Sequence, residues 1–165
     1  MNNLKIIAAA ASDWGIGKDG DLLFSIKQDM KFFRETTMDN VVVMGRKTLE
    51  SFPGGRPLKN RVNIVFTRNR EFSRDDVICV SSVEELFDVL KNYEDKKAFV
   101  IGGGEIYSLL LPYCNEALIT KVNSKKRADT FINNFDDDVN WRVHQESEEY
   151  TESDCSFKFV SYKRI

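Results

Sequence analysis

The sequence contains a single histidine, His144, and this scarcity excludes more chemistry than any other feature of its composition. Catalytic triads of the Ser-His-Asp or Cys-His kind would depend on that one residue. It lies in the stretch from Trp141 to Gln145, whose pattern is typical of a strand with charged flanks. We therefore expect His144 to have no catalytic role.

Cysteine is also rare, and its spacing excludes two further kinds of site. Cys79, Cys114 and Cys155 form no CxxC pair and have no companion histidines, so the sequence predicts neither a disulfide framework nor a zinc site. A metal would need carboxylates alone, and the densest group of them, Asp136 to Asp138, lies in a polar connection. We interpret that connection as a solvated loop and predict no metal site.

An excess of charge and a long apolar run are both missing. The sequence has 24 Lys and Arg residues against 26 Asp and Glu residues, so it has no net positive charge that would favour binding to nucleic acid or to an anionic membrane surface. The apolar run near the N-terminus, Ile6 to Ala11, is far shorter than the ~20 residues of a membrane helix, and no charged leader precedes it. We expect a cytoplasmic protein, and nothing in the sequence demands a dimer.

Apolar segments of strand length alternate with segments of helical period along nearly the whole chain, and no linker separates them. This pattern predicts one α/β domain over residues 1–165. Because no helical segment separates the last two strands, the sheet should be mostly parallel with an antiparallel end. The strands are expected at 4–11, 41–44, 61–66, 76–80, 98–101, 117–122, 141–145 and 156–163.

Four segments have helical patterns, and two of them begin with the spacing of a capping box. Ser25 is followed by Gln28, and Ser82 by Glu85, which is the arrangement in which a serine and a later acid or amide satisfy the first backbone N–H groups. These helices should end near Thr37 and Lys91. The other two are expected over 46–52 and 105–111, the last being stopped by Pro112.

Two glycine-containing junctions between a strand and a helix are candidate ligand sites, because ligands bind at such ends of open α/β sheets. Gly45-Arg46-Lys47-Thr48 places two cations at a helix start, which favours an anion, although a solvated basic turn is an equal alternative. Gly102-Gly103-Gly104 suggests close approach by a phosphate or a flat cofactor ring, the alternative being a tight turn. Neither has the spacing of a P-loop or a Rossmann fingerprint.

Asp29 is the third candidate, because helical spacing places it on the apolar face of Ile26, Met30 and Phe33. Burial there would raise its pKa and suit it to proton handling or to pairing with a cationic heterocycle. Alternatively, it is an acid of the first helical turn that points into water. The segment from Ser12 to Ser25 before this helix is either a mobile cover or a plain surface connection.

These motifs, taken in order, resemble dihydrofolate reductase, and the bacterial form in particular. No single motif is decisive, but their order and spacing are specific, and the resemblance runs from about Leu4 to Tyr162. The segments that carry it are Ile7-Ala8-Ala9, Gly15-Ile16-Gly17, Lys27-Gln28-Asp29-Met30-Lys31-Phe32-Phe33, Met44-Gly45-Arg46-Lys47-Thr48, Gly55-Arg56-Pro57-Leu58, Ile101-Gly102-Gly103-Gly104-Glu105-Ile106-Tyr107 and Ile119-Thr120.

The resemblance implies a three-layer sandwich with a mainly parallel eight-stranded sheet and about four helices. It also implies reduction of dihydrofolate to tetrahydrofolate for one-carbon metabolism, with hydride transfer from NADPH to C6 and protonation at N5. Asp29 would orient the pterin and Thr120 would bond its carboxylate, while Arg61 would hold the glutamate α-carboxylate. The implied substrate and antifolate contacts are completed by Ile7, Phe24, Met30, Phe33 and Arg56.

The cofactor contacts that the resemblance implies lie mostly at the two glycine junctions. Gly45 to Thr48 would take the phosphates, Arg46, Thr67 and Arg68 would surround the 2′-phosphate, and a cis bond is expected between Gly102 and Gly103. The remaining implied contacts are Ala9, Ile16, Gly17, Gly20, Asp21, Lys47, Ser81, Ile101, Gly104, Glu105, Ile106 and Tyr107.

One departure from the family pattern precedes the helix of Asp29. Leu23-Phe24 replaces the usual Pro-Trp, which keeps a flat apolar wall but removes an indole N–H. Leu22 stands where the family's covering loop places an apolar residue over the nicotinamide. Two alternatives remain: the related pyrimidine reductase of riboflavin biosynthesis, and a nucleotide-binding module without catalysis, in which a buried Asp29 would be a liability.

Overall fold

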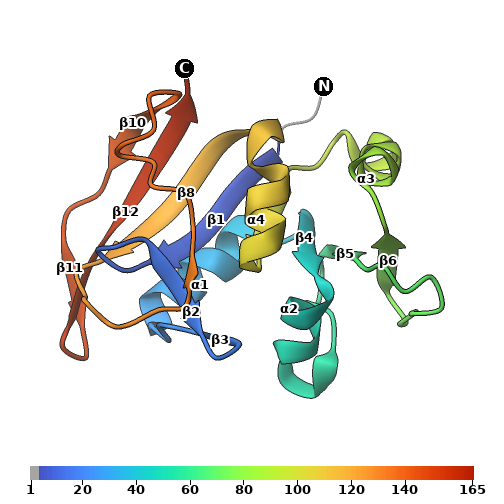
Figure 1. Ribbon diagram of the computed structural model, residues 1–165, viewed down its shortest axis with the longest axis horizontal. Helices are drawn as coiled ribbons and strands as arrows, with labels where there is room; N and C mark the ends of the chain where they lie inside the picture. The colour runs from blue at the N-terminus through green and yellow to red at the C-terminus, as the bar shows by residue number, and fades with distance from the viewer. Residues whose placement is uncertain (1–3) are drawn as a thin grey trace.

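A computed structural model describes residues 4–165 and confirms the mostly parallel sheet with an antiparallel end (Figure 1). Eight strands lie in the order β10-β12-β8-β1-β7-β4-β5-β6, and β11 (Tyr150–Glu152) pairs with β12. Strands β8 to β6 are parallel, whereas β12 is antiparallel to β8 and to β10. Their bounds are β1 Leu4–Ala10, β4 Val41–Gly45, β5 Val62–Phe66, β6 Val77–Val80, β7 Ala98–Gly102, β8 Cys114–Val122, β10 Trp141–Glu146 and β12 Cys155–Arg164.

Four α-helices accompany the sheet, as expected. Short 3-10 turns at Pro53–Gly55, Lys91–Tyr93 and Leu111–Tyr113 follow three of them, and Pro112 lies in the turn that ends the last helix. In the part of the chain from 4 to 165, no helix is long and apolar enough to cross a membrane. The helices are α1 Lys27–Thr37, α2 Arg46–Ser51, α3 Val83–Leu90 and α4 Gly104–Leu110.

Helices cover both faces of the sheet and make it the middle of three layers. In β4, Val41 and Val43 join the core that α3 and α4 complete, whereas Val42 and Met44 pack with Leu49 of α2 on the other face. A strand that is buried on both faces has no polar alternation, which explains the continuous apolar run of this segment. Figure 1 shows α4 lying across one face of the sheet.

Helix α1 packs on the face opposite α4, as the alternation of β8 shows. Ile119 belongs to the core beneath α3 and α4, whereas Val122 packs with Ile26 and Phe157. Ile26 directly precedes α1, and Thr120, which shares the face of Val122, contacts this helix. The path of α1 over this face therefore decides where Asp29 lies.

The predicted capping box at Ser25 is wrong. Helix α1 begins at Lys27, and its N-cap residue Ile26 forms no side-chain cap. Instead, Glu152 of β11 accepts hydrogen bonds from the backbone N–H groups of Lys27 at 2.6 Å and Gln28 at 3.1 Å. These bonds hold the pKa of Glu152 below its ordinary value. A distant acid thus performs the function that we had assigned to a local serine.

The other predicted cap is confirmed. The hydroxyl of Ser82 accepts a hydrogen bond from the Glu85 backbone N–H at 3.1 Å, directly before α3. The Glu85 side chain does not complete the reciprocal half of the box, because its carboxylate accepts bonds from the hydroxyl and the backbone N–H of Ser81. Helix α3 therefore starts as the sequence indicates, with a different partner for its acid.

The segment from Ser12 to Ser25 contains two short strands rather than an irregular connection. Strands β2 (Gly15–Lys18) and β3 (Asp21–Leu22) form a hairpin, and β2 also pairs with β9 (Thr130–Phe131) in a separate three-stranded sheet. Gly15 is required there, since an added Cβ would lie 2.5 Å from Ala128 Cβ. The segment is thus hydrogen-bonded, through β2, to strand β9, which lies more than 100 residues later in the chain.

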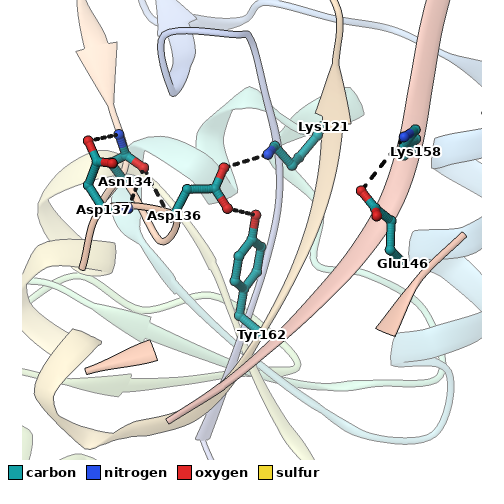
Figure 2. Close-up of polar contacts among 7 residues, drawn as sticks. All are labelled: Lys121, Asn134, Asp136, Asp137, Glu146, Lys158 and Tyr162. Atoms are coloured by element: carbon teal, nitrogen blue, oxygen red, sulfur yellow. Dashed lines mark hydrogen bonds and ion pairs between the residues drawn. The ribbon is translucent and has the colours of Figure 1, made fainter. Parts of the chain in front are cut away.

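The acidic stretch from Asp136 to Asp138 is a polar loop, as predicted, but one of its acids has a structural role. Asp136 pairs with Lys121 Nζ at 2.6 Å and accepts a hydrogen bond from the Tyr162 hydroxyl at 2.8 Å (Figure 2). Burial and this carboxylate raise the pKa of Tyr162. These contacts fasten the loop to β8 and β12.

Candidate active site

Four neighbouring parallel strands end together at one edge of the sheet. Met44 of β4 is in register with Gly102 of β7, while Phe66 of β5 is in register with both Gly45 and Val80. The residues that follow these strands are therefore neighbours, although they are distant in sequence. Such an edge, at the carboxyl ends of parallel strands, is where α/β sheets bind ligands.

Two arginines follow adjacent strands at this edge, after β4 and β5. The guanidinium of Arg46 lies 4.2 Å from the centre of the Phe72 ring and 3.4 Å from a carboxylate oxygen of Glu50. Arg68 is exposed two residues beyond the end of β5. Stacking on an aromatic ring leaves the edge of a guanidinium available, so the pair suits an anionic group.

Glycines keep this edge free of side chains. A Cβ on Gly45 would lie 3.1 Å from Ile106 Cγ1, and one on Gly103 would lie 3.8 Å from Thr48 Oγ1. Gly102 has a φ of 117°, which side chains rarely permit, and its peptide bond to Gly103 is cis as expected. The two glycine junctions of the sequence are thus brought side by side.

Asp29 is partly buried between α1 and β8, so of the two alternatives for this residue the buried carboxyl is confirmed and the solvent-exposed one is excluded. Its Oδ1 accepts a hydrogen bond from Thr120 Oγ1 at 2.5 Å. Burial raises the pKa of this carboxyl, and the bond from Thr120 partly opposes the shift. A carboxyl that is anchored through one oxygen retains the other for a ligand.

Tyr107 brings a third element to this carboxyl. Its hydroxyl donates a hydrogen bond to the Ile7 carbonyl oxygen of β1 at 2.8 Å. Burial and the charge of Asp29 both raise the pKa of Tyr107, so it remains a neutral donor at physiological pH. Asp29, Thr120, Tyr107 and the Ile7 carbonyl therefore form one group of fixed donors and acceptors.

The raised pKa of Asp29 predicts a pH-dependent effect on stability. The folded protein holds the proton of Asp29 more tightly than the unfolded chain, so protonation of this carboxyl stabilises the folded state. This stabilisation of the fold is complete below the ordinary pKa of 3.8, and it is lost as the pH rises through the pKa of Asp29 in the folded protein. We expect Asp29→Asn, which removes the cost of the buried charge, to melt at a higher temperature than the wild type at pH 7. The gain should shrink towards pH 4, and an equal gain in thermal melts at both pH values would contradict this.

Arg61 lies at the other end of α1, with its guanidinium held from two sides. Nη1 donates to Thr37 Oγ1 at 3.1 Å and Nε donates to the Lys59 carbonyl at 2.9 Å. Three of its five N–H groups remain for a ligand. Burial and the nearby charge of Arg34 lower the pKa of Arg61, which means that two cations lie close together.

Asp29, Phe33 and Thr37 follow one another at intervals of four residues and therefore lie along one stripe of α1. The stripe presents a carboxylate, then an aromatic ring, then the arginine that Thr37 anchors, over roughly 12 Å at 1.5 Å per residue. An elongated ligand that binds along it would need hydrogen-bond donors at one end, an aromatic middle and an anionic far end.

Comparison with known proteins agrees with this geometry. The family model for dihydrofolate reductase matches residues 3–164. The chain belongs to this family. It is 34% identical to the dihydrofolate reductase of Bacillus subtilis, over 90% of this chain and 87% of the relative, and 32% identical to that of Mycobacterium tuberculosis, over 99% of both.

A second group of relatives is longer. The chain is 35% identical to the bifunctional dihydrofolate reductase-thymidylate synthase of Glycine max, over 98% of this chain but 33% of the relative. It therefore spans about a third of the length of that protein.

The segment in which the resemblance implies a covering loop forms the hairpin of β2 and β3. Leu22 is 83% exposed, and the neighbourhood of Gly20 is open. Ile16 is buried in the core, so its side chain is not available to a cofactor in this structure. The remaining loop residues implied by the family, Gly17 and Asp21, lie on the paired strands of the hairpin.

The other implied site residues are distributed around these two groups. Ala9 is in register with Thr120, which places it beside the Asp29 group. Phe24 packs against the cluster of Ile26, Val122 and Phe157, whereas Met30 is 56% exposed. At the edge where β7, β4, β5 and β6 end, Thr67 and Ser81 follow β5 and β6, and Ile101 of β7 packs against the cluster of Val42, Met44, Leu49 and Val65. Lys47, Arg56 and Glu105 are exposed.

Sequence reasoning missed two residues at the far end of the stripe. Arg34 lies near Arg61, and Thr37 is the acceptor that holds Arg61 in place. Thr37 could have been found, because it continues the four-residue spacing of Asp29 and Phe33. The position of Arg34 carries no such signal, because a single exposed arginine on a helix is ordinary.

Proposed function

We propose that this chain reduces dihydrofolate to tetrahydrofolate with NADPH. The observation that carries the proposal is the stripe of α1, on which Asp29, Phe33 and the anchor of Arg61 follow one another. Dihydrofolate has the matching order of groups: a pteridine with adjacent N–H donors, a benzoyl ring and an anionic glutamate. Membership of the dihydrofolate reductase family supports the same assignment.

In this proposal Asp29 orients the pteridine. Thr120 holds Oδ1, so the carboxylate can accept N–H groups of the ring and its amino substituent in one fixed plane. Because burial raises its pKa, Asp29 also holds a proton at less acidic pH than an exposed carboxyl and supports protonation at N5. Tyr107 fixes the strand carbonyl of Ile7 beside the same ring.

The residues at the strand edge fit NADPH. Gly45 and Gly102 to Gly104 leave backbone N–H groups accessible to the pyrophosphate, and Arg46 with Arg68 supplies positive charge for a 2′-phosphate. When bound, NADPH supplies the hydride that is transferred to C6. The chain's contribution is to hold the two ligands next to one another and, through the loop of Leu22, to exclude water.

Cofactor preference tests the phosphate assignment. We expect Arg68→Ala to raise the KM for NADPH roughly tenfold, because one charge-assisted contact to the 2′-phosphate is lost. The KM for NADH, which lacks that phosphate, should not change. Arg70→Ala, which removes an exposed arginine two residues away, is the matched control. Equal effects of Arg68→Ala on both cofactors would remove it from the phosphate site.

The decisive experiment follows the absorbance of the reduced nicotinamide when the purified protein meets NADPH and dihydrofolate. Rapid oxidation that needs both compounds is expected, and its absence in a folded protein that binds NADPH would refute the proposal.

We further infer that the chain acts as a cytoplasmic monomer that also binds antifolates, since one chain carries every group that the reaction needs. A mass above about 19 kDa in solution would contradict the monomer.

A further inference from the structure

The connection between β5 and β6, residues 67–76, contains a single apolar side chain, that of Phe72. Every other residue of this connection is polar or charged. Phe72 is half-buried and packs against the apolar cluster beneath α2, to which Leu49 belongs. One aromatic ring therefore anchors a polar loop to the face of the sheet that α2 covers.

Hydrogen bonds on both sides of Phe72 fix the loop around it. The backbone N–H of Phe72 donates to the Asn69 carbonyl at 3.1 Å, and the Asn69 side-chain oxygen accepts from the Glu71 N–H at 2.9 Å. Arg74 Nη1 donates to the carbonyl of Gly55 at 2.9 Å, in the 3-10 turn that follows α2. The position of the ring is thus set by the backbone as well as by the core.

Two guanidinium groups lie over this ring. The central carbon of the Arg46 guanidinium is 4.2 Å from the ring centre, and that of Arg74 is 5.3 Å from it. Both distances are within the range of cation–π attraction. Arg46 directly follows β4, whereas Phe72 lies beyond the end of the neighbouring strand β5, so the contact joins the ends of two paired strands.

The contacts of Arg46 leave its terminal nitrogens available. Its Nε donates to a carboxylate oxygen of Glu50 at 3.4 Å, while the ring of Phe72 lies against the guanidinium. Within residues 4–165, no hydrogen bond occupies Nη1 or Nη2. An arginine that is mobile in solvent must be ordered when it binds a ligand, which weakens binding about two- to tenfold. An arginine that a ring already holds avoids most of this loss.

We propose that Phe72 is a positioning residue for cofactor selection, because it holds the Arg46 guanidinium ready for the 2′-phosphate of NADPH. The inference rests on the proposed binding of NADPH at this edge, and it adds a residue that acts through Arg46. NADH has a hydroxyl group in place of that phosphate. Loss of the ring should therefore weaken NADPH and spare NADH, whereas a residue that only packs the core would affect both cofactors alike.

The test is a calorimetric titration of the intact chain with NADPH and with NADH, in the absence of dihydrofolate. Phe72→Leu keeps the apolar anchor but removes the aromatic face, so the Kd of NADPH should rise about fivefold and that of NADH less than about twofold. Phe72→Tyr keeps the ring and should keep the wild-type ratio of the two constants. If Phe72→Leu does not fold, Phe72→Met makes the same comparison. Equal weakening of both cofactors would overturn the inference.

Phe52 provides the matched control. It packs against the same apolar cluster as Phe72, but among residues 4–165 no Lys or Arg lies over its ring. Phe52→Leu should therefore leave the ratio of the two dissociation constants at its wild-type value. A change in this ratio as large as that of Phe72→Leu would assign the effect to the apolar cluster and overturn the role of the ring.

A double-mutant cycle shows whether Phe72 acts through Arg46. In an Arg46→Ala background, Phe72→Leu should change neither dissociation constant further, because no guanidinium remains for the ring to hold. A further fivefold loss of NADPH affinity would contradict the proposal. A wild type that binds NADH as tightly as NADPH would remove the 2′-phosphate site together with this inference, whereas oxidation of NADPH by dihydrofolate tests the proposed reaction separately.

Discussion

Asp29→Asn is expected to lower turnover at neutral pH by about 10²- to 10⁴-fold, the contribution usual for a positioned proton-handling group. The amide has the shape of the carboxyl and can still accept the Thr120 hydrogen bond, so the fold should persist. It cannot ionise, and it offers an N–H where the pteridine requires an acceptor. Steady-state assays with NADPH and dihydrofolate between pH 5 and 9 measure the effect.

The pH profile distinguishes a proton-handling role from simple damage to the site. In the wild type, kcat/KM should fall as the pH rises through the elevated pKa of Asp29, because the protonated form is lost. In Asp29→Asn this step should disappear, and turnover should partly recover at low pH, where the substrate is protonated by solvent.

Two controls accompany this variant. Its affinity for NADPH should equal that of the wild type, since the cofactor residues lie at the ends of other strands. Glu35→Gln removes a carboxylate from the exposed side of the same helix and should leave activity unchanged. If Asp29→Asn retains wild-type turnover, Asp29 has no part in the reaction.

Arg61→Lys is expected to raise the KM for dihydrofolate about 10- to 100-fold with a smaller change in kcat. The guanidinium can bind a carboxylate through two parallel N–H groups while Thr37 and Lys59 hold its other donors. An ammonium keeps the charge but loses this geometry and one or both anchors. Because the contact is remote from the reacting atoms, its loss should affect binding more than the chemical step.

A shortened substrate provides the sharpest control for Arg61. A dihydropteridine without the glutamate should give the same kcat/KM with the wild type and with Arg61→Lys, because neither can make the contact. Arg142→Lys, on the exposed strand β10, should behave as the wild type with both substrates. An unchanged KM for dihydrofolate in Arg61→Lys would remove Arg61 from the substrate site.

The sequence predicted the main strands and helices well because their signals are local. The apolar run of β4 is buried on both faces, and Ser82 caps α3 within three residues. The helical spacing of Asp29 and Phe33 likewise placed both residues on one stripe. Each of these features depends on neighbours in sequence, so periodicity and capping rules can detect them.

The errors occurred where a distant segment replaced a local interaction. Ser25 had the spacing of a cap, but Glu152 supplies the cap from β11, about 125 residues away. Strands β2 and β3 are only four and two residues long, and β2 contains two glycines, so neither shows a clear alternation. The pairing of β2 with β9 appears only in three dimensions.

By itself, the sequence determined the α/β class, the order of the strands along the chain and the residue types of the site. The tertiary structure decided that Thr120 meets Asp29 across 91 residues and that Thr37 anchors Arg61. It also decided that Glu152 of β11 caps α1. Local patterns report the preferences of a segment, whereas burial, pKa shifts and unfilled space depend on which segments pack together.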